Sequence, residues 1–303
     1  MTPVLQFENI SRSFKKGVPV LDGVTFSMAE GEVVGLLGRN GAGKTTLIRI
    51  AMGMLFPHTG TVRVFGLSPT GEPVAVKKRI GYVAEDQVLP GSASLAELIS
   101  LHDYLFDTWD PALERQLLDR FGLDLGAKIR HLSKGQARQA ALICAVCHRP
   151  DLLVLDEPAG GLDPAARREF LETSIELLNR EGTAILFSSH HMTDVERLGG
   201  RVVLLDGGKV RLDRPLDQIH EDHCVVMIPR DAVASSVIES LPGCLRVRPV
   251  FGDWHAVFEG APDSVRLRIQ AALHLDGIRC VSVPLEELFV ELVGNDRPVE
   301  VSS

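Results

Sequence analysis

The segment from Gly38 to Thr46 has the residue types and spacing needed to bind phosphate. Its letters, GRNGAGKTT, contain the pattern G-x-x-x-x-G-K-T and directly follow the apolar run Val33–Leu37. Glycines let the backbone turn tightly so that its N–H groups converge on phosphate oxygens, and a helix that begins there adds positive charge. The pattern predicts that Lys44 reaches the β- and γ-phosphates of a nucleotide and that the Thr45 hydroxyl binds Mg²⁺. A chance glycine-rich turn would not need a strand before it and a helix after it.

The acidic pair Asp156 and Glu157 is a second candidate for chemistry, because it follows the apolar run Leu152–Leu155. Such a run is typical of a strand buried in a parallel sheet, and its carboxyl end lies at the sheet edge where ligands bind. We expect Asp156 to help hold Mg²⁺ and Glu157 to polarise a water molecule that attacks the γ-phosphorus. Two solvated acids at an ordinary strand end would look similar, but the upstream phosphate-binding pattern favours the functional interpretation.

The stretch Leu132–Gln136, with the letters LSKGQ, is the third candidate. Ser133 and Gln136 have the spacing of a capping box, which would begin a helix whatever the function. A helix N-terminus that bears Ser and Gly is also suited to bind an anion, so both interpretations hold together.

Strands and helices must alternate to position these segments. Apolar periodicity predicts strands at 4–7, 24–28, 32–37, 61–65, 80–83, 152–155, 183–188 and 201–205, and helices at 45–54, 165–179 and 191–198. Residues 93–150 are predicted to be mainly helical, beginning at a capping box of Ser94 and Glu97. The alternation predicts a mostly parallel α/β core with a helical insertion near 90–150.

A second, smaller domain is expected after the core. Residues 206–221 contain Gly, Asp and Pro and predict a short hairpin and linker. Beyond them we predict strands near 223–228, 245–250, 254–258 and 279–283, and helices near 231–240, 263–274 and 285–293. The expected organisation is a main domain at 1–220 and a C-terminal accessory α+β domain at 221–303.

The composition suits a folded, soluble protein rather than a nucleic-acid or membrane-spanning one. Net charge is −8, which is unfavourable for binding a phosphate backbone, so no direct nucleic-acid partner is expected. No apolar run reaches the roughly 18 residues of a membrane span, and the N-terminus does not resemble a secretory signal. Five cysteines in such a chain fit a reducing cytoplasm.

The stretch Cys144–His148 matches C-x-x-C-H, the attachment motif of c-type haem. It lies within an alanine-rich apolar segment, residues 139–148, that is predicted to be a buried helix. Cysteine packs as a small hydrophobic residue in such places. We therefore predict that these side chains pack in the core and do not hold haem.

The order and spacing of the three motifs resemble those of ATP-binding cassette (ABC) ATPases. L-S-x-G-Q, followed by a helix and a strand that ends in D-E-P, is similar to the signature motif of that family, and the resemblance covers about residues 4–220. It implies an ABC-type P-loop NTPase fold with a mostly parallel sheet, an N-terminal antiparallel β part and a helical subdomain. It also implies ATP hydrolysis with Mg²⁺.

The resemblance assigns roles to individual residues. His190 follows a predicted strand and matches the switch histidine of the family, with His191 as a weaker alternative. Asp163 matches the D-loop and would lie at a dimer interface. Phe14 takes the place of the aromatic residue that stacks on adenine, although simple packing would also explain an aromatic residue there. The implied catalytic residues are Lys44, Glu157 and His190. The implied ATP-binding residues are Gly38, Arg39, Asn40, Gly41, Ala42, Gly43, Lys44, Thr45, Thr46 and Phe14, with Ser133, Gly135 and Gln136 supplied in trans; the implied metal-binding residues are Thr45, Asp156 and Glu85.

Glu85 is a departure from the family pattern. It stands after Ile80–Ala84, where a glutamine is usual, and Gln87 follows two residues later. We expect Glu85 to take the glutamine's role because it directly follows the predicted strand, with Gln87 as the alternative. An acid here resembles the ATPases of ABC-2-type exporters, and so does the C-terminal stretch Pro284–Val290, although any amphipathic helix would also fit that stretch.

The resemblance implies that two subunits, in a homodimer or heterodimer, bind two ATP molecules between them and open on hydrolysis. A separate polytopic membrane permease would dock near residues 85–105, including Val88-Leu89-Pro90, and hold the chain on the cytoplasmic face of the cell membrane. A soluble ABC ATPase that acts on ribosomes or DNA is the alternative, disfavoured by the single cassette and the absence of long heptads. A P-loop GTPase or kinase is a third, disfavoured because Asn-Lys-x-Asp does not occur.

Overall fold

The computed structural model describes residues 3–15, 17–158, 160, 162, 164–179, 182–275 and 277–293. The chain forms two compact units, Met1–Asp213 and Arg214–Ser303. Within the described ranges, no helix combines the length and the apolar character that crossing a membrane requires.

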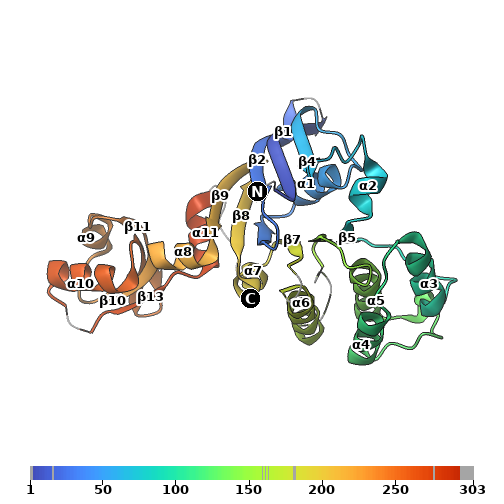
Figure 1. Ribbon diagram of the computed structural model, residues 1–303. Helices are drawn as coiled ribbons and strands as arrows, with labels where there is room; N and C mark the ends of the chain where they lie inside the picture. The colour runs from blue at the N-terminus through green and yellow to red at the C-terminus, as the bar shows by residue number, and fades with distance from the viewer. Residues whose placement is uncertain are drawn as a thin grey trace. The chain divides into compact units, whose positions relative to one another are not determined.

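Strands and helices alternate through the first unit (Figure 1). Its elements are β1 (Leu5–Lys15), β2 (Val18–Met28), β3 (Val33–Leu37), α1 (Lys44–Ala51), β4 (Thr59–Val64), α2 (Pro73–Lys77), β5 (Ile80–Val83), α3 (Leu95–Leu105), α4 (Pro111–Phe121), η1 (Ile129–His131), α5 (Lys134–Val146), β6 (Leu152–Leu155), α6 (Pro164–Asn179), β7 (Ala184–Ser189), α7 (Met192–Leu198), β8 (Arg201–Asp206) and β9 (Lys209–Pro215).

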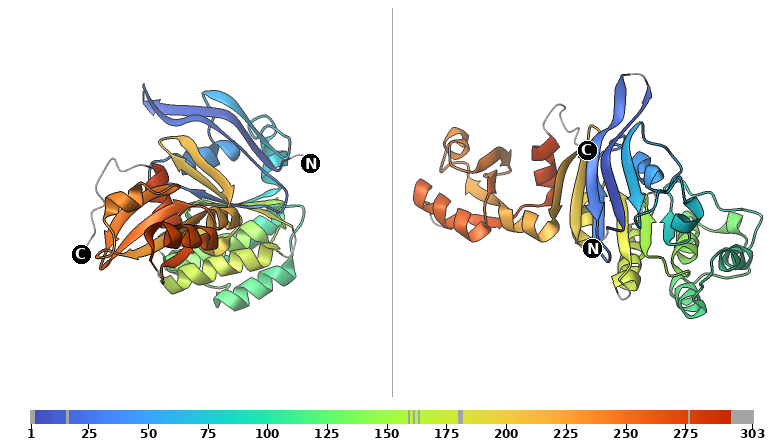
Figure 2. Two further views of the ribbon diagram at one scale, coloured as in Figure 1. Left: turned by 90° about the vertical axis from the view of Figure 1, so that its left-hand side faces the viewer. Right: turned by 45° about the horizontal axis from the view of Figure 1, so that its top comes forward.

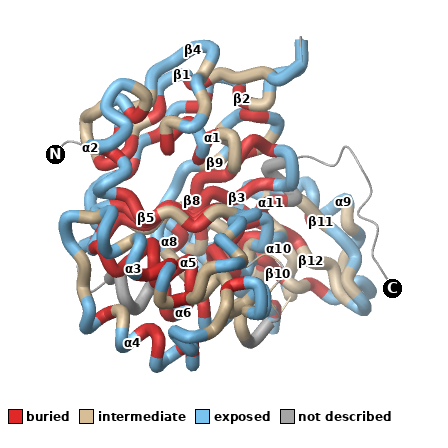
Figure 3. Tube along the Cα trace, turned by 90° about the vertical axis from the view of Figure 1, so that its right-hand side faces the viewer, coloured by how far each residue is buried: buried red, intermediate tan, exposed pale blue. Residues whose placement is uncertain are grey.

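A six-stranded sheet in the order β5-β6-β7-β3-β8-β9 forms the centre of this unit. β5, β6, β7, β3 and β8 pair in parallel, and Leu155 lies opposite both Val83 and Phe187. All four residues of β6 are buried, as expected for a parallel strand covered on both faces. The tube in Figure 3 shows buried backbone running through these strands. The predicted mostly parallel α/β core is confirmed.

A three-stranded antiparallel sheet, in the order β2-β1-β4, covers one face of the central sheet together with α1. Phe7 of β1, Ile48 of α1 and Leu186 of β7 belong to one hydrophobic core, which joins the three layers. Figure 2 shows this blue sheet and the green helices of residues 95–146 on opposite sides of the central sheet. The antiparallel β part and the helical subdomain expected from the family resemblance are both present.

Local capping fixes where the helices of the insertion begin. Ser94 and Glu97 form a capping box at α3, and Ser133 and Gln136 form another at α5. The C-terminal end of α5 lies against β5 so closely that a Cβ added to Gly81 would be 2.0 Å from the carbonyl oxygen of Ala145. Glycine is therefore the one residue type at position 81 that permits this contact.

The second unit has four strands and four helices within the described residues. They are α8 (Leu216–Asp222), β10 (His223–Pro229), α9 (Ser235–Glu239), β11 (Cys244–Val250), β12 (Asp253–Glu259), α10 (Pro262–Leu273), β13 (Arg279–Ser282) and α11 (Leu285–Val293). The antiparallel sheet has the order β11-β12-β10-β13, and the succession β10-α9-β11-β12-α10-β13 is that of a split β-α-β fold. Phe258, Val226 and Ile269 share its core.

Some predicted element boundaries are wrong. Of the short hairpin and linker predicted within residues 206–221, the hairpin is present, since β9 follows β8 after two residues and lies next to it in the sheet, but the linker is instead helix α8, in which Leu216 and Ile219 are buried three residues apart. The two polar residues between them, Asp217 and Gln218, hide this short apolar spacing in the sequence. Helix α2 was not predicted, and α1 ends at Ala51 because Gly53 adopts a positive φ of 65°.

The cysteine–histidine stretch at the end of α5 packs in the core, as predicted. Cys144, Cys147 and His148 are all buried, and the His148 ring stacks on Phe106 with 3.8 Å between ring centroids. Burial raises the pKa of both thiols above the ordinary value and lowers the pKa of His148 to about 4.

His148 should make the fold sensitive to acid. An unfolded histidine takes up a proton near pH 6.5, whereas the folded protein keeps His148 neutral down to about pH 4. The unfolded state therefore binds more protons between these values, and stability falls as pH falls through them. His148→Phe should remove this term, so that its stability relative to wild type rises by about 2 to 3 kcal/mol between pH 7 and pH 4.

Urea unfolding of both proteins at several pH values measures this difference. His131→Asn, at an exposed histidine of the same helical region, is the control and should give a nearly constant difference. A constant difference for His148→Phe as well would contradict the assignment.

Candidate active site

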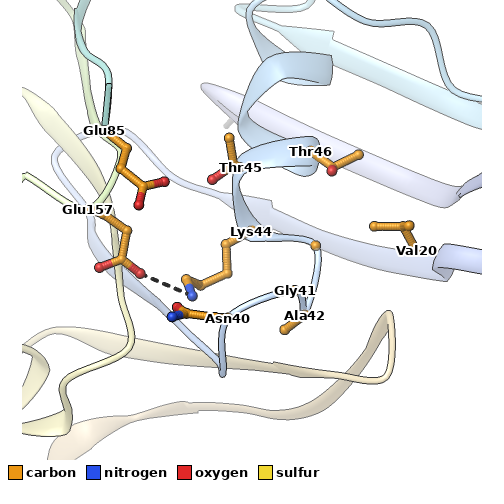
Figure 4. Close-up of a pocket in the computed structure, with 10 residues that line it drawn as sticks. Val20, Asn40, Gly41, Ala42, Lys44, Thr45, Thr46, Glu85 and Glu157 are labelled. Atoms are coloured by element: carbon orange, nitrogen blue, oxygen red, sulfur yellow. Dashed lines mark ion pairs between the residues drawn. The ribbon is translucent and has the colours of Figure 1, made fainter. Parts of the chain in front are cut away.

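The loop between β3 and α1 forms a phosphate-sized concavity. Gly43, at the N-cap of α1, has φ 106°, and a Cβ there would lie 2.6 Å from the Leu21 side chain and 2.8 Å from the Val20 oxygen. Only glycine fits both the conformation and the space. The pocket has a volume of about 220 Å³ and is lined by Val20, Asn40, Gly41, Ala42, Gly43, Lys44, Thr45, Thr46, Glu85 and Glu157 (Figure 4).

Lys44 is the first residue of α1, and its ammonium group is held inside the pocket wall. Its Nζ donates to the Gly38 carbonyl oxygen at 2.6 Å and lies 3.1 Å from Glu157 Oε1. Only 5% of Lys44 is exposed, so the ammonium depends on these oxygens. A phosphate in the pocket would therefore meet a cation whose position is already fixed.

Asp156 follows β6 and is almost completely buried. Its Oδ1 accepts hydrogen bonds from Ser188 Oγ at 2.7 Å and from Thr45 Oγ1 at 3.2 Å. Burial raises the pKa of the carboxyl, and these two hydrogen bonds act in the opposite direction. Mg²⁺ prefers oxygen donors and is commonly held by one or two protein groups together with substrate phosphates. Thr45 and Asp156 fit that donor set.

Glu157 points into the same pocket from the next position along the chain. Its backbone has a positive φ of 45°, which is unusual for a side chain of this size and is often found at functional sites. Its N–H donates to Ser188 Oγ at 2.9 Å, and its Oε2 lies 2.8 Å from Nδ1 of His190, just beyond β7. The predicted catalytic residues Lys44, Glu157 and His190 are thus brought together. Ser188, which orders both acids, was missed because a serine in an apolar strand carries no distinctive signal.

Glu85, and not Gln87, lines the pocket. Figure 4 shows the Glu85 carboxylate pointing toward Thr45 from the end of β5. Burial raises the pKa of Glu85 above its ordinary value, and the carboxylates of Asp156 and Glu157 raise it further. Gln87 folds back instead, so that its Oε1 accepts a hydrogen bond from the Ala84 N–H at 3.3 Å. This geometry favours Glu85 over Gln87 for the family's glutamine position.

The signature residues, which are predicted to contact the ATP of a partner subunit, do not line the pocket of their own chain. Among the described residues that line the pocket, none is Ser133, Gly135 or Gln136. Phe14 is 60% exposed and also lies outside the lining, and the Arg12 guanidinium is 5.3 Å from its ring centroid. Val20 lines the pocket instead as an apolar side chain that the sequence did not indicate.

Two further predicted residues are also absent from the pocket lining. Gly38 and Arg39 do not line the pocket; their carbonyl oxygens lie 2.6 and 3.4 Å from Lys44 Nζ. Asp163, predicted at a dimer interface, lies outside the described residues.

Comparison with known proteins agrees with this geometry. A family model described as ABC transporter matches residues 21–160. Nod factor export ATP-binding protein I of Rhizobium etli is 31% identical over 96% of this chain and 94% of its own length. A daunorubicin resistance ATP-binding protein of Streptomyces coeruleorubidus is 32% identical over 92% of this chain and 93% of its own. A solved structure of an ATP-binding subunit of an ABC transporter is 31% identical, covers 72% of this chain and 92% of that one, and has a TM-score of 0.65.

The chain belongs to the ATP-binding protein family of ABC transporters. It is an ATP-binding and ATP-hydrolysing transporter subunit with the ABC cassette fold. The family, fold and ATPase activity predicted from the sequence are confirmed.

Glu157→Gln should slow ATP hydrolysis by about a hundredfold or more, the scale of general-base catalysis, because an amide cannot accept the water proton. Its affinity for ATP should stay near that of wild type, since Lys44 and the glycine loop are untouched. Steady-state hydrolysis and equilibrium binding of a fluorescent ATP analogue measure the two quantities. His191→Gln, at the neighbouring histidine that does not bond Glu157, is the control. Near-normal turnover of Glu157→Gln would move the base elsewhere, with Glu85 the next candidate.

Proposed function

We propose that two copies of this chain, or one copy and a related subunit, bind two ATP molecules between them. The observation that carries the proposal is the position of the signature residues. Ser133 is exposed at the N-terminus of α5, and neither it nor Gly135 lines the pocket of its own chain. The N–H groups and positive dipole of a helix N-terminus suit a phosphate, so a second subunit can close the open side of the pocket.

The residues of one pocket divide the work of hydrolysis. The N–H groups of the glycine loop and the Lys44 ammonium bind and orient the phosphates. Glu157 accepts a proton from the attacking water, and His190 holds the second carboxylate oxygen so that the base keeps its orientation. When bound, Mg²⁺ would neutralise phosphate charge; Thr45 and Asp156 would hold it, and Glu85 would contact it or the attacking water.

We further propose that this ATPase drives an ABC-2-type exporter. Two of its relatives bear names that denote export or drug resistance, over nearly their whole length. The segment from residue 85 to residue 105 also carries exposed apolar side chains, namely Val88, Leu101, Tyr104 and Leu105, of which Val88 is 93% exposed. Exposed apolar side chains of this kind suit a protein partner. A membrane permease that docks here would place the chain on the cytoplasmic face of the membrane, with the unit Met1–Asp213 as the ATPase domain and the unit Arg214–Ser303 as the accessory domain.

Complementation between two inactive variants tests the shared site. Lys44→Ala should lose ATP affinity, because it removes the buried cation of the pocket. Ser133→Arg should bind ATP normally, because Ser133 belongs to the opposite pocket, yet it should hydrolyse ATP much more slowly, because the arginine side chain blocks the place of the phosphate that Ser133 would contact in the partner's pocket. In a mixed dimer, the wild-type loop of the Ser133→Arg chain meets the wild-type signature of the Lys44→Ala chain.

Mixing the two variants should therefore restore activity, and each variant alone at the same total concentration is the control. Equal loss of ATP binding in both folded variants, without recovery on mixing, would show that each site lies within one chain.

A further inference from the structure

Arg138 connects α5 to the loop that carries Glu85. Its Nη1 donates to the Ala84 carbonyl oxygen at 2.6 Å, and its Nη2 donates to the Glu85 carbonyl oxygen. These residues are 54 and 53 positions apart in the chain. The guanidinium thus binds the carbonyl oxygens of two successive residues. The Gln87 Oε1 accepts a hydrogen bond from the Ala84 N–H, so that both backbone polar groups of Ala84 are bonded.

The charges around this loop explain why it needs to be held. Burial raises the pKa of Glu85, and the carboxylates of Asp156 and Glu157 raise it further because they repel its charged form. Asp86 adds a further acid beside them. An unrestrained loop would relieve this repulsion by turning Glu85 away from the pocket.

The Arg138 guanidinium is suited to oppose that movement. Burial lowers its pKa from the ordinary value, whereas Asp86, Glu85 and Asp156 act in the opposite direction. Arginine stays charged in proteins, and its planar group offers donors in a fixed fork that can satisfy two carbonyl oxygens at once. A lysine at this position would carry the same charge, but it lacks the planar fork of donors that can bind both carbonyl oxygens.

We propose that Arg138 is the positioning residue for Glu85, and that it couples the two ATP sites. The inference rests on the proposed roles of Glu85 and of Ser133. Arg138 is on the helix that Ser133 caps, and Ser133 serves the ATP of the partner subunit. When the N-terminus of α5 settles on that ATP, the same helix holds Glu85 in the pocket of its own subunit. Closure at one site is thereby transmitted to the metal and water position of the other.

The variants Arg138→Met and Arg138→Lys, with Glu85→Ala and the double variant Glu85→Ala/Arg138→Met, test the proposal. Arg115→Met is the matched control, because Arg115 is an exposed arginine of α4 in the same subdomain. Hydrolysis is measured over a range of Mg²⁺ concentrations, ATP binding is measured in EDTA, and thermal unfolding shows that each variant is folded.

Arg138→Met should leave ATP affinity in EDTA unchanged and raise the Mg²⁺ concentration for half-maximal hydrolysis about tenfold, as expected for a group that orients a metal-site residue. Glu85→Ala should show a similar change, and the double variant should be no worse than Glu85→Ala alone. Arg138→Lys should remain impaired, because the charge is kept and the fork is lost.

Three results would overturn the inference. Wild-type Mg²⁺ dependence in Arg138→Met or Arg138→Lys, while Glu85→Ala is impaired, would show that the fork does not position Glu85. Losses that multiply in the double variant would show that Arg138 acts through another group. A silent Glu85→Ala would remove the proposed role of Glu85 and the inference with it, and ATP hydrolysis by the wild type would still stand.

Discussion

The parallel register of β5, β6, β7 and β3 is the constraint on which the active site depends. Val83, Leu155 and Phe187 lie side by side, so β5 and β6 end at the same level, and β7 and β3 end together two residues further on, where Ser189 lies beside Leu37. Each strand is followed at once by a reactive segment: Glu85, the acids Asp156 and Glu157, His190, and the glycine loop. The chemistry is therefore assembled by the sheet, and short loops suffice to complete it.

The electrostatics of the pocket set what it can bind. Three carboxylates, those of Glu85, Asp156 and Glu157, surround one buried ammonium, Lys44, and the pKa values of Glu85 and Asp156 are both raised. A phosphate alone would add to this excess of negative charge. A divalent cation placed between the phosphates and these carboxylates would offset part of that negative charge.

Most of the fold and the core of the site could be predicted because their signals are local in the sequence. β5 and β6 begin and end where predicted, since continuous apolar runs mark strands buried on both faces. The contacts of Ser188 with Asp156 and of Arg138 with Ala84 could not be predicted, because each joins residues more than 30 positions apart that only the folded sheet brings together. The choice between Glu85 and Gln87 likewise needed side-chain directions that sequence spacing does not contain.

The close contact between Gly81 and Ala145 gives α5 the mechanics of a lever. The fulcrum is the C-terminal end of the helix, where the backbones of α5 and β5 approach too closely to slide. The working end is Lys134, eleven residues away, or about 17 Å at 1.5 Å per residue. A tilt of only about 10° about the fulcrum would then displace the working end by about 3 Å, roughly the length of one hydrogen bond. A small rotation of the helical subdomain would thus be enough to make or break the contacts that we propose between the signature residues and a phosphate.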